Sequence, residues 1–588
     1  MYSLHKCRKI LHAASKRYRK KKKVTDKGRH FEEKLKALKE AIGGKERKKA
    51  EELCREIEKD MALFLPRTPL EKTFQFILGL SFALAIAILI RQTWFEPYVI
   101  PTGSMRPTLK EQDFVFVFKT DFGLNVPLST SQFYFGSDLI KRGQIVVFTG
   151  EDMDIPDVNT MYFYLIPGKK QFVKRLIAKP GDLLYFYGGL LYGIDRDGNE
   201  ITEYKERSWF HEMEHIPFIH FDGKVKTGQM ATHGIFTSAT LYQMNEPIAK
   251  LTASVFGEGS GEMLPIPRAG SASVVPNTYG DLWGFKNYGM GKIVSGKEIT
   301  SQEKAPLFLE ITHHPSMHPV KIIRDEYGRV RPGLSYTTSI LPLSDKAIDR
   351  LFLSLYTARF VVKNGRASLY GSRDVAEEFL PKLEGVPDGT YEFQDGKAYK
   401  VLWSSITKEL AKNHPLYLRT PERLQLFYNL GNEFHLHIAR PSRYIYFRDH
   451  DLYAMGHPIY QENDPELQSF IQKEKATDTP FIDLGSPIKD GKLQVELLKK
   501  NGLYVPENMY LVLGDNHARS SDSRVFGFVP QGNIRGGVNL LFWPLSPRMG
   551  SLPEPGYSWI TLPNIVVWIV AIICFFLSFS YYKRKTKT

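Results

Sequence analysis

Two long apolar runs divide this chain and limit how it can fold. The first, FQFILGLSFALAIAILI (residues 74–90), contains no charged residue and has the length of a short membrane-spanning helix. Trp94, Phe95 and Tyr98 follow it and are typical of a membrane–water interface. The second run, LPNIVVWIVAIICFFLSFSYY (residues 562–582), precedes the basic end KRKTKT, so we expect transmembrane helices at 73–92 and 559–582. A buried core helix is the alternative for the first run, whereas a cleaved signal peptide would begin nearer the N-terminus.

The distribution of charge predicts a topology. The chain has a formal net charge of +15, and residues 1–72 alone contain 23 lysines and arginines against 11 acidic residues. Positive segments favour the cytoplasmic side. We therefore expect a multi-pass protein of the inner (cytoplasmic) membrane, with both termini in the cytoplasm and the segment between the two runs on the outer, periplasmic side. Within residues 1–72, helical spacing on both sides of Gly43–Gly44 predicts a helical hairpin. A contact of this basic segment with RNA or acidic lipid is left open.

The cysteines and histidines do not predict a disulfide or a metal centre outside the membrane. Cys7, Cys54 and Cys574 are the only cysteines, so the segment between the two apolar runs contains none. The histidine groups of that segment, at 313–318 and 435–437, lack a third ligand at a known zinc spacing. We expect no metal.

Three short stretches between the apolar runs contain candidate catalytic residues. Ser104 lies in PYVIPTGSMRPTL (97–109), which otherwise reads as a polar exit loop. A serine nucleophile needs a base, and no G-x-S-x-G motif is present. A buried lysine can serve if its pKa falls by about three units, which requires about 4 kcal/mol of desolvation. Lys174 in QFVKRLIAKPGD (171–182) lies in such an apolar, strand-like stretch. The third stretch, LGDNHARSSDSRVFGFVP (513–530), reads by itself as a polar hairpin loop.

These stretches, with KRGQIVVF (141–148), resemble the bacterial type I signal peptidases. That family consists of membrane-bound Ser/Lys endopeptidases (leader peptidases) that remove signal peptides from exported preproteins. The four blocks occur in the family's order behind a membrane helix, and they cover about a third of the chain, mainly 74–185 and 495–545. The resemblance implies a mainly β catalytic core of antiparallel strands, no cofactor and no nucleic acid. It implies as partners preprotein signal peptides, the lipid bilayer and the protein export machinery.

The resemblance also assigns roles to individual residues. Ser104 would attack the scissile carbonyl, and a neutral Lys174 would accept its proton and later activate water. Thr102 and the backbone N–H of Ser104 would form the oxyanion hole, and Ser520 would orient the lysine. Gly514 would be a small residue that lets the backbone pass close to the lysine. Asp522 and Arg524 would form a supporting ion pair.

Substrate specificity is assigned in the same way. Two shallow apolar pockets would accept small residues before the cut and so favour Ala-X-Ala. The residues at the matching positions are Ile100, Pro101, Met105, Leu109, Phe172 and Val173. Each of them is also compatible with a plain core position.

The chain departs from the family mainly in length. Roughly 330 residues separate the third and fourth blocks, too many for a loop, so we expect one or more inserted domains there. We expect this insertion to be mostly β, with hairpins turning at Asp395–Gly396 and near residues 449–451 and with helices at 345–358 and 404–413. The expected order is a basic cytoplasmic segment (1–72), a transmembrane helix (73–92), the first part of the catalytic core (93–195), the insertion (196–490), the second part of the core (491–558), a second transmembrane helix (559–582) and a basic tail (583–588).

Two rival functions were weighed against an endopeptidase. Pieces of the penicillin-binding motif set occur, but K-T-G at 226–228 precedes two of the S-x-x-K matches and the third, at Ser3, lies in the expected cytoplasmic segment. A membrane-anchored binding or scaffold protein with an idle peptidase core is the other alternative, and the presence of Ser104, Lys174 and Ser520 argues against it. The sequence therefore predicts a signal peptidase with an unusual insertion.

Overall fold

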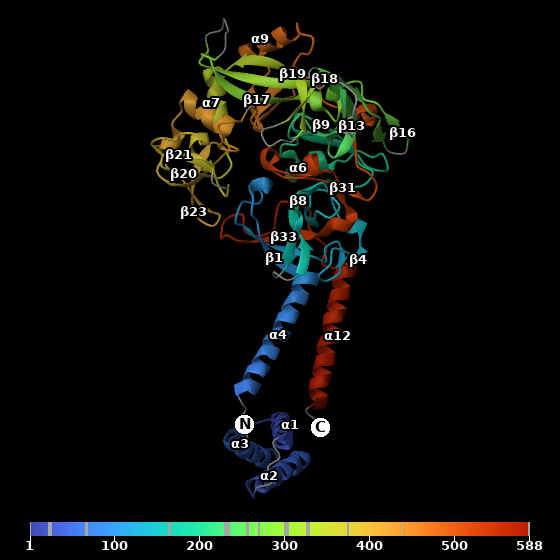
Figure 1. Ribbon diagram of the computed structural model, residues 1–588, viewed down its shortest axis with the longest axis vertical. Helices are drawn as coiled ribbons and strands as arrows, with labels where there is room; N and C mark the ends of the chain where they lie inside the picture. Colours follow the sequence, from blue (N-terminus) through green and yellow to red (C-terminus); the bar gives the residue numbers. More distant parts are fainter. Residues whose placement is uncertain are drawn as a thin grey trace. The chain divides into compact units, whose positions relative to one another are not determined.

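The computed structural model divides the chain into two compact units (Figure 1). The helical unit comprises Met1–Trp94 and Trp559–Thr588, and the β unit comprises Phe95–Ser558. The residues that the structure describes are 2–20, 26–64, 69–162, 166–227, 236–254, 258–268, 271–298, 305–324, 330–372, 375–438 and 440–585.

The N-terminal part of the helical unit contains helices α1 (Leu4–Lys20), α2 (Asp26–Gly43) and α3 (Arg47–Phe64). Helices α2 and α3 lie on either side of Gly43–Gly44, where the hairpin was predicted, and α1 is an additional helix. It packs on the other two because Cys7, Ile10 and Ala14 recur at helical spacing and join their buried apolar cluster. The cytoplasmic location of these helices remains a prediction, and part of the basic run, residues 21–25, lies outside the described residues.

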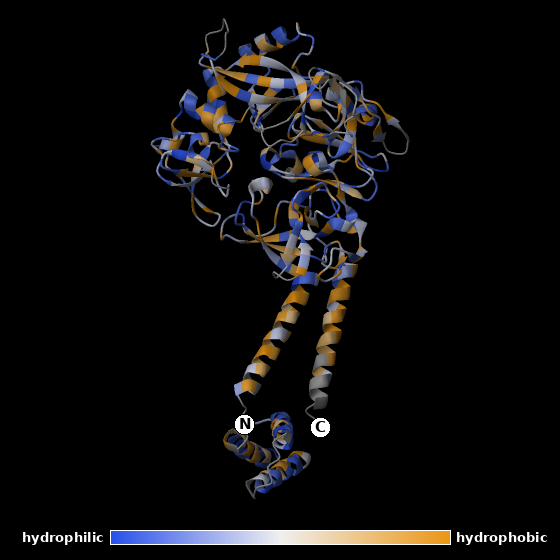
Figure 2. Cartoon of the chain, viewed as in Figure 1, coloured by the Kyte–Doolittle hydropathy of each residue, from blue (hydrophilic) through white to orange (hydrophobic). Residues whose placement is uncertain are grey.

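The helical unit also contains the two apolar helices, α4 (Pro69–Thr93) and α12 (Leu562–Lys585). Figure 2 shows both as mainly hydrophobic along their described lengths. Within α4, the segment Phe76–Thr93 is long and apolar enough to cross a membrane. The apolar stretch of α12, Leu562–Leu577, is shorter, so a second span remains a prediction. The end of the basic tail, residues 586–588, lies outside the described part of the chain.

A seven-stranded antiparallel sheet in the β unit joins two distant parts of the chain. Alternating FVFVF in β2 and the fully buried IVVFT of β5 give it strands with strong β propensity and an apolar cluster on each face. In order across the sheet, the strands are β1 (Phe95–Val99), β2 (Phe114–Phe118), β33 (Ile534–Trp543), β5 (Ile145–Thr149), β8 (Gln171–Ala178), β31 (Met509–Leu513) and β32 (Val529–Pro530).

The residues between β8 and β31 form further antiparallel sheets. A six-stranded sheet contains β19 (Val330–Pro342), β18 (Leu307–Arg324), β17 (Tyr288–Ser295), β25 (Tyr444–Arg448), β26 (Asp451–Ala454) and β27 (His457–Tyr460). A five-stranded sheet contains β21 (Arg366–Leu369), β20 (Phe360–Lys363), β22 (Gly389–Gln394), β23 (Lys397–Trp403) and β24 (Ile406–Glu409). A four-stranded sheet contains β11 (Lys224–Thr227), β12 (Phe236–Gln243), β13 (Glu246–Ser254) and β14 (Ser260–Met263). A three-stranded sheet contains β10 (Leu190–Ile194), β9 (Leu183–Tyr187) and β30 (Leu503–Tyr504).

Two-stranded ribbons and short helices complete the described part of the β unit. The ribbons are β3 (Gly123–Asn125) with β4 (Gln132–Phe135), β6 (Asn159–Tyr162) with β7 (Ile166–Lys169), β15 (Ile266–Arg268) with β16 (Ser271–Val274), and β28 (Ile488–Lys489) with β29 (Lys492–Leu493). The α-helices are α5 (Glu203–Glu206), α6 (Ser208–His211), α7 (Asp345–Leu353), α8 (Pro421–Gln425), α9 (Pro465–Glu474), α10 (Val495–Asn501) and α11 (Ser523–Phe526).

The mainly β prediction is confirmed, with one local error. Hairpins turn at Asp395–Gly396 and at residues 449–450, and a helix begins at Asp345, as expected. The predicted helix at 404–413 is wrong, because Ile406–Glu409 forms β24 and pairs with β23. The predicted stretch is shorter than the roughly 12–15 residues that an isolated helix needs to be stable in water, so pairing with the neighbouring strand decides its structure.

One apolar core joins the insertion to the catalytic sheet. Ile177 and Leu511 of the sheet belong to the same buried cluster as Phe218, Phe285 and Tyr288 of the intervening chain. The packing therefore shows no break at 195/196 or 490/491, and those domain boundaries remain a proposal.

Replacing Phe285 with alanine should destabilise the whole β unit. Phe285 is fully buried, and its ring centroid lies 4.9 Å from that of Phe218 and 5.6 Å from that of Trp283. Loss of such a ring typically costs about 3–5 kcal/mol. We expect a clear fall in the thermal unfolding midpoint of the detergent-solubilised full chain, and little change for the control Phe133→Ala, whose ring is 74% exposed. Equal midpoints for the two variants would contradict a shared core.

Candidate active site

Ser104 lies in a tight turn that follows the first strand of the catalytic sheet. Strand β1 ends at Val99, and Gly103–Met105 form a 3₁₀ turn. Ile100 is pinned on both sides, because its N–H donates to the carbonyl of Asp113 (2.8 Å) and its carbonyl accepts from the N–H of Gln112 (2.7 Å). Ser104 is 8% exposed. The turn therefore holds a nearly buried hydroxyl at a defined position.

Lys174 lies in the middle of strand β8 and points its amine at this hydroxyl. Its Nζ lies 2.9 Å from Ser104 Oγ and 2.9 Å from the carbonyl oxygen of Val173. The strand is held between β5, where Val146 is the partner of Lys174, and β31. The structure thus brings together the two residues predicted to form the catalytic pair.

The surroundings of Lys174 favour the uncharged amine. The residue is only 5% exposed, and burial lowers the pKa of Lys174 to about 8. The carboxylates of Asp522 and Asp515 oppose this shift, while Arg524 reinforces it. At pH 7 about a tenth of the amine is therefore neutral, and the neutral fraction reaches one half near pH 8.

Asp522 and Arg524 form a buried ion pair next to the dyad. Arg524 Nε donates to Asp522 Oδ1 at 2.8 Å, and the N–H of Gly514 donates to Asp522 Oδ2 at 2.9 Å. Burial alone would raise the pKa of Asp522, but Arg524 and these hydrogen bonds hold it below its usual value. The pair ties the start of α11 to Gly514, the residue that directly follows β31.

Gly514 is required by close packing. A Cβ added there would lie 2.1 Å from Ser520 Oγ and 2.5 Å from the carbonyl oxygen of Ser104. The nearest atoms thus belong to Ser520 and to the nucleophile's own backbone, whereas the sequence analysis placed the crowding at the lysine.

Two predicted hydroxyls lie near the dyad without contacting the lysine. Thr102 Oγ1 lies 3.4 Å from Ser104 Oγ, on the exposed side of the turn. Ser520 is buried, but the described residues show no hydrogen bond from its hydroxyl to Lys174 Nζ. The roles assigned to Thr102 in the oxyanion hole and to Ser520 in orienting the amine remain predictions.

The predicted pocket residues separate into three environments. Ile100, Met105, Leu109 and Val173 pack in one apolar cluster. Phe172 faces the other side of β8 and packs against Phe148, with ring centroids 5.8 Å apart. Pro101 is exposed beside the nucleophile turn. Alternation along β8 explains the separation, because neighbouring side chains point to opposite faces of the sheet.

Two residues that the sequence analysis did not single out hold the nucleophile turn. Asn516 donates from its backbone N–H to the carbonyl of Ser104 (3.1 Å) and from Nδ2 to the carbonyl of Gly103 (3.0 Å). Asp515 forms a bidentate ion pair with buried Arg175, through two contacts of 2.8 Å. The only sequence signal for either residue is its place in a Gly-Asp-Asn turn directly after an apolar strand.

The histidines considered as metal ligands have packing partners instead. His313 Nε2 lies 2.7 Å from Ser339 Oγ, and its ring stacks on Phe481. Within the described ranges, no group of three or more His, Cys, Asp or Glu side chains could hold a metal ion.

Comparison with known proteins supports the family resemblance. The family model described as signal peptidase, peptidase S26, matches residues 73–235 and 438–543. Ser104, Lys174 and the Gly514–Arg524 segment all fall within these matched residues, whereas residues 236–437 fall between them.

Curated relatives are similar over the same part of the chain. A Signal peptidase I of Rickettsia felis is 28% identical over 158 residues, covering 25% of this chain and 52% of that protein. A Signal peptidase I of Rickettsia akari is 31% identical over 125 residues (20% and 41%), and one of Rickettsia prowazekii is 32% identical over 124 residues (20% and 41%). The chain thus spans about half the length, or less, of the curated relatives it matches. Taken with the blocks around Ser104, Lys174 and Gly514, these matches show that the chain is similar to the signal peptidase S26 family over residues 73–235 and 438–543, which lie on either side of residues 236–437.

Proposed function

We propose that the protein is a membrane-bound serine endopeptidase that cleaves N-terminal signal peptides from exported preproteins after small residues. The observation that carries this proposal is the 2.9 Å separation of Ser104 Oγ from the buried amine of Lys174. A neutral amine at that distance can take the hydroxyl proton as the oxygen attacks. Similarity to the signal peptidase family supports the choice of substrate.

The proposed reaction proceeds through an acyl-enzyme. Ser104 Oγ attacks the scissile carbonyl carbon while Lys174 Nζ takes the hydroxyl proton. The tetrahedral intermediate collapses, the C–N bond breaks, and the ammonium of Lys174 returns the proton to the leaving amine. Lys174 then deprotonates a water, which attacks the ester carbonyl, and Ser104 leaves with that proton.

The proposed specificity is assigned to the residues around Ser104. The backbone N–H of Ser104 and the hydroxyl of Thr102 are the proposed oxyanion donors, each typically worth about 2.7–4 kcal/mol in the transition state. Ile100, Met105, Leu109 and Val173 belong to the apolar cluster next to the Ser104 turn, and they are the proposed pocket walls. Shallow apolar walls accept alanine and exclude large side chains, which is the basis for an Ala-X-Ala preference.

We also propose a location in the inner membrane. The apolar segment Phe76–Thr93 supports one span. A second span through α12 would leave both basic termini in the cytoplasm and the β unit outside. Interaction with the export machinery belongs to the same proposal.

A scaffold function with an idle peptidase core is not favoured. An idle core would have no need to keep an amine buried beside a serine hydroxyl, because a buried lysine is costly unless it has a role.

Removing either member of the dyad should abolish cleavage. In proteoliposomes with a preprotein that ends its signal peptide in Ala-X-Ala, we expect Ser104→Ala and Lys174→Met to lower kcat by at least about a thousandfold. Lys170→Met, at an exposed lysine just before the same strand, is the matched control and should cleave normally. Mass spectrometry of the released peptide locates the cut. Wild-type cleavage by either dyad variant would refute the assignment.

The pH dependence of cleavage should report the lysine. Only the neutral amine accepts a proton, and the pKa of Lys174 is about 8. We expect kcat/KM to rise about tenfold per pH unit below that value and to level off above it. Fluorescence across the range checks that the protein stays folded. Activity that is flat down to about pH 5 would rule out a lysine base.

Substituting Gly514 should disturb the nucleophile specifically. The added methyl of Gly514→Ala meets Ser520 Oγ and the carbonyl of Ser104, so the turn must shift. Misplacement on the scale of 1 Å typically costs about a hundredfold in kcat. Gly532→Ala, which meets nothing within 4 Å, is the control. Adding Ser520→Ala should not rescue activity, because the clash with Ser104 remains; full rescue would show that the turn had not moved.

A further inference from the structure

The five-stranded sheet of the insertion packs directly against the loop that follows the nucleophile. This loop, Arg106–Gln112 (the 106–112 loop), connects the Ser104 turn to strand β2. The residues of the insertion that hydrogen-bond to it lie between 359 and 404, within the segment that the family model does not match. The contact is therefore a property of this chain's insertion.

Glu392 of β22 is the centre of a buried charge cluster. Its carboxylate accepts hydrogen bonds from Arg106 Nη2 (2.7 Å), Lys110 Nζ (2.8 Å) and Arg359 Nε (3.0 Å). Glu392 and Arg359 are both 0% exposed. Glu111 completes the cluster, because its Oε2 accepts from Arg106 Nε at 2.8 Å. Burial alone would raise the pKa of Glu392, but the surrounding cations hold it below its usual value, so the carboxylate is ionised.

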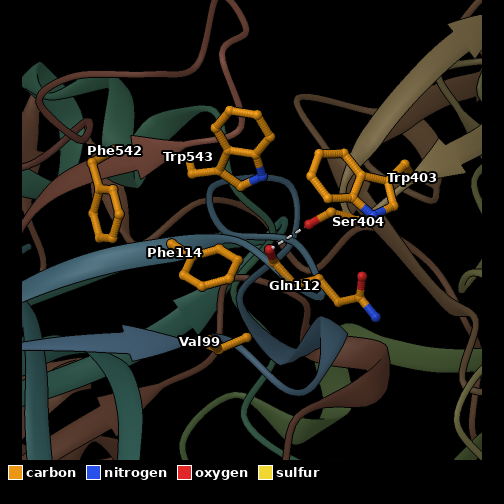
Figure 3. A pocket seen from close by; sticks show the side chains of 7 residues that line it. All are labelled: Val99, Gln112, Phe114, Trp403, Ser404, Phe542 and Trp543. Atoms are coloured by element: carbon orange, nitrogen blue, oxygen red, sulfur yellow. Dashed lines mark hydrogen bonds between the residues drawn. The ribbon is translucent and has the colours of Figure 1, made fainter.

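Hydrogen bonds between uncharged groups also connect the insertion to the 106–112 loop. Gln112 Nε2 donates to the hydroxyl of Tyr370 (2.6 Å), and Ser404 Oγ donates to the carbonyl of Gln112 (3.1 Å; Figure 3). Beside them, the ring of Trp403 meets that of Trp543 of β33 edge-on, with centroids 5.6 Å apart. Figure 3 shows both tryptophans among the residues that line an apolar pocket. The pocket has a volume of about 590 Å³, and its lining also includes Val99, Phe114 and Phe542.

A movement of the 106–112 loop would displace Ser104. Arg106 lies two residues after Ser104, and its N–H donates to the carbonyl of Gly103 (3.2 Å). A Cβ on Gly103 would lie 2.5 Å from Glu111 Oε1, so the cluster is packed against the turn itself. Losing the carboxylate of Glu392 would leave buried cations without their shared counter-ion, and such groups rearrange to regain solvent or another partner.

We propose that Glu392 is a positioning residue, which holds Ser104 in its attacking position by fixing Arg106 and Lys110 of the 106–112 loop. The inference rests on the proposed peptidase function. Under it, the insertion takes part in building the active site, and its removal would disturb Ser104 even in a protein that remained folded.

The test is single-turnover cleavage by the full chain in proteoliposomes, with enzyme in saturating excess over a preprotein. A preparation that is partly unfolded keeps the wild-type rate constant under these conditions, because the folded fraction still saturates the substrate. We expect Glu392→Gln to lower the rate constant by about 10–100-fold, with KM in steady state changed less than about twofold. A wild-type rate constant for Glu392→Gln would overturn the proposal.

A matched control and a double variant separate position from general stability. Asp464→Asn makes the same carboxylate-to-amide change in the insertion, at a residue paired with Lys346 and Arg350, and should leave the rate constant unchanged. If Glu392 acts through Arg106, Arg106→Gln combined with Glu392→Gln should be no slower than the slower single variant. Multiplication of the two single effects, or an equal loss in Asp464→Asn, would contradict the proposal.

A milder variant tests the proposal if Glu392→Gln does not fold. Tyr370→Phe with Ser404→Ala removes two hydrogen bonds to Gln112 without unpairing a charge. We expect a fall of about two- to fivefold in the same rate constant, and no change would refute the proposal. Failure of the proposed function has a different signature, because the wild type would then show no Ser104-dependent cleavage.

Discussion

The exclusion of water from the amine of Lys174, within a β-sheet, is the constraint on which the rest of this structure depends. The amine of Lys174 can act as a base only while water is excluded, yet the strands around it must stay hydrogen-bonded and the neighbouring charges must be paired. The structure meets this by burying Arg175 against Asp515 and Arg524 against Asp522, on either side of the amine. The carboxylates partly offset the desolvation, so the pKa of Lys174 stays at about 8 and does not fall further.

Much of the site could be predicted from the sequence because its parts lie in short, dense blocks. Ser104 was recognisable from the turn residues after an apolar run, and Lys174 from its apolar strand. Asn516 and Asp515 were contained in a recognised block, but only the fold shows that they hold the Ser104 turn and Arg175. Glu392 could not have been found this way, because 286 positions separate it from Arg106 and its surroundings contain no motif.

In the fold, too, features set by short sequence patterns were predicted, whereas features set by contacts with distant segments were not. Alternating apolar residues predicted the strands of the core, and Asp-Gly turns predicted hairpins. The error at 404–413 arose because a stretch of that length is too short to form a stable helix by itself, and pairing with β23 made residues 406–409 a strand. Helix α1 was not predicted for a different reason. Most of its residues are charged or polar, and its narrow apolar stripe is recognised only from its packing against α2 and α3.

The order of strands in the catalytic sheet has a consequence for biosynthesis. Strand β33 lies between β2 and β5, and β31 lies beside β8, although both are translated more than 300 residues after these neighbours. A nascent chain therefore exposes Ser104 and Lys174 long before the sheet that aligns them can close. Under the proposed peptidase function, the growing polypeptide should have no activity until β31 and β33 have been translated and have joined the sheet.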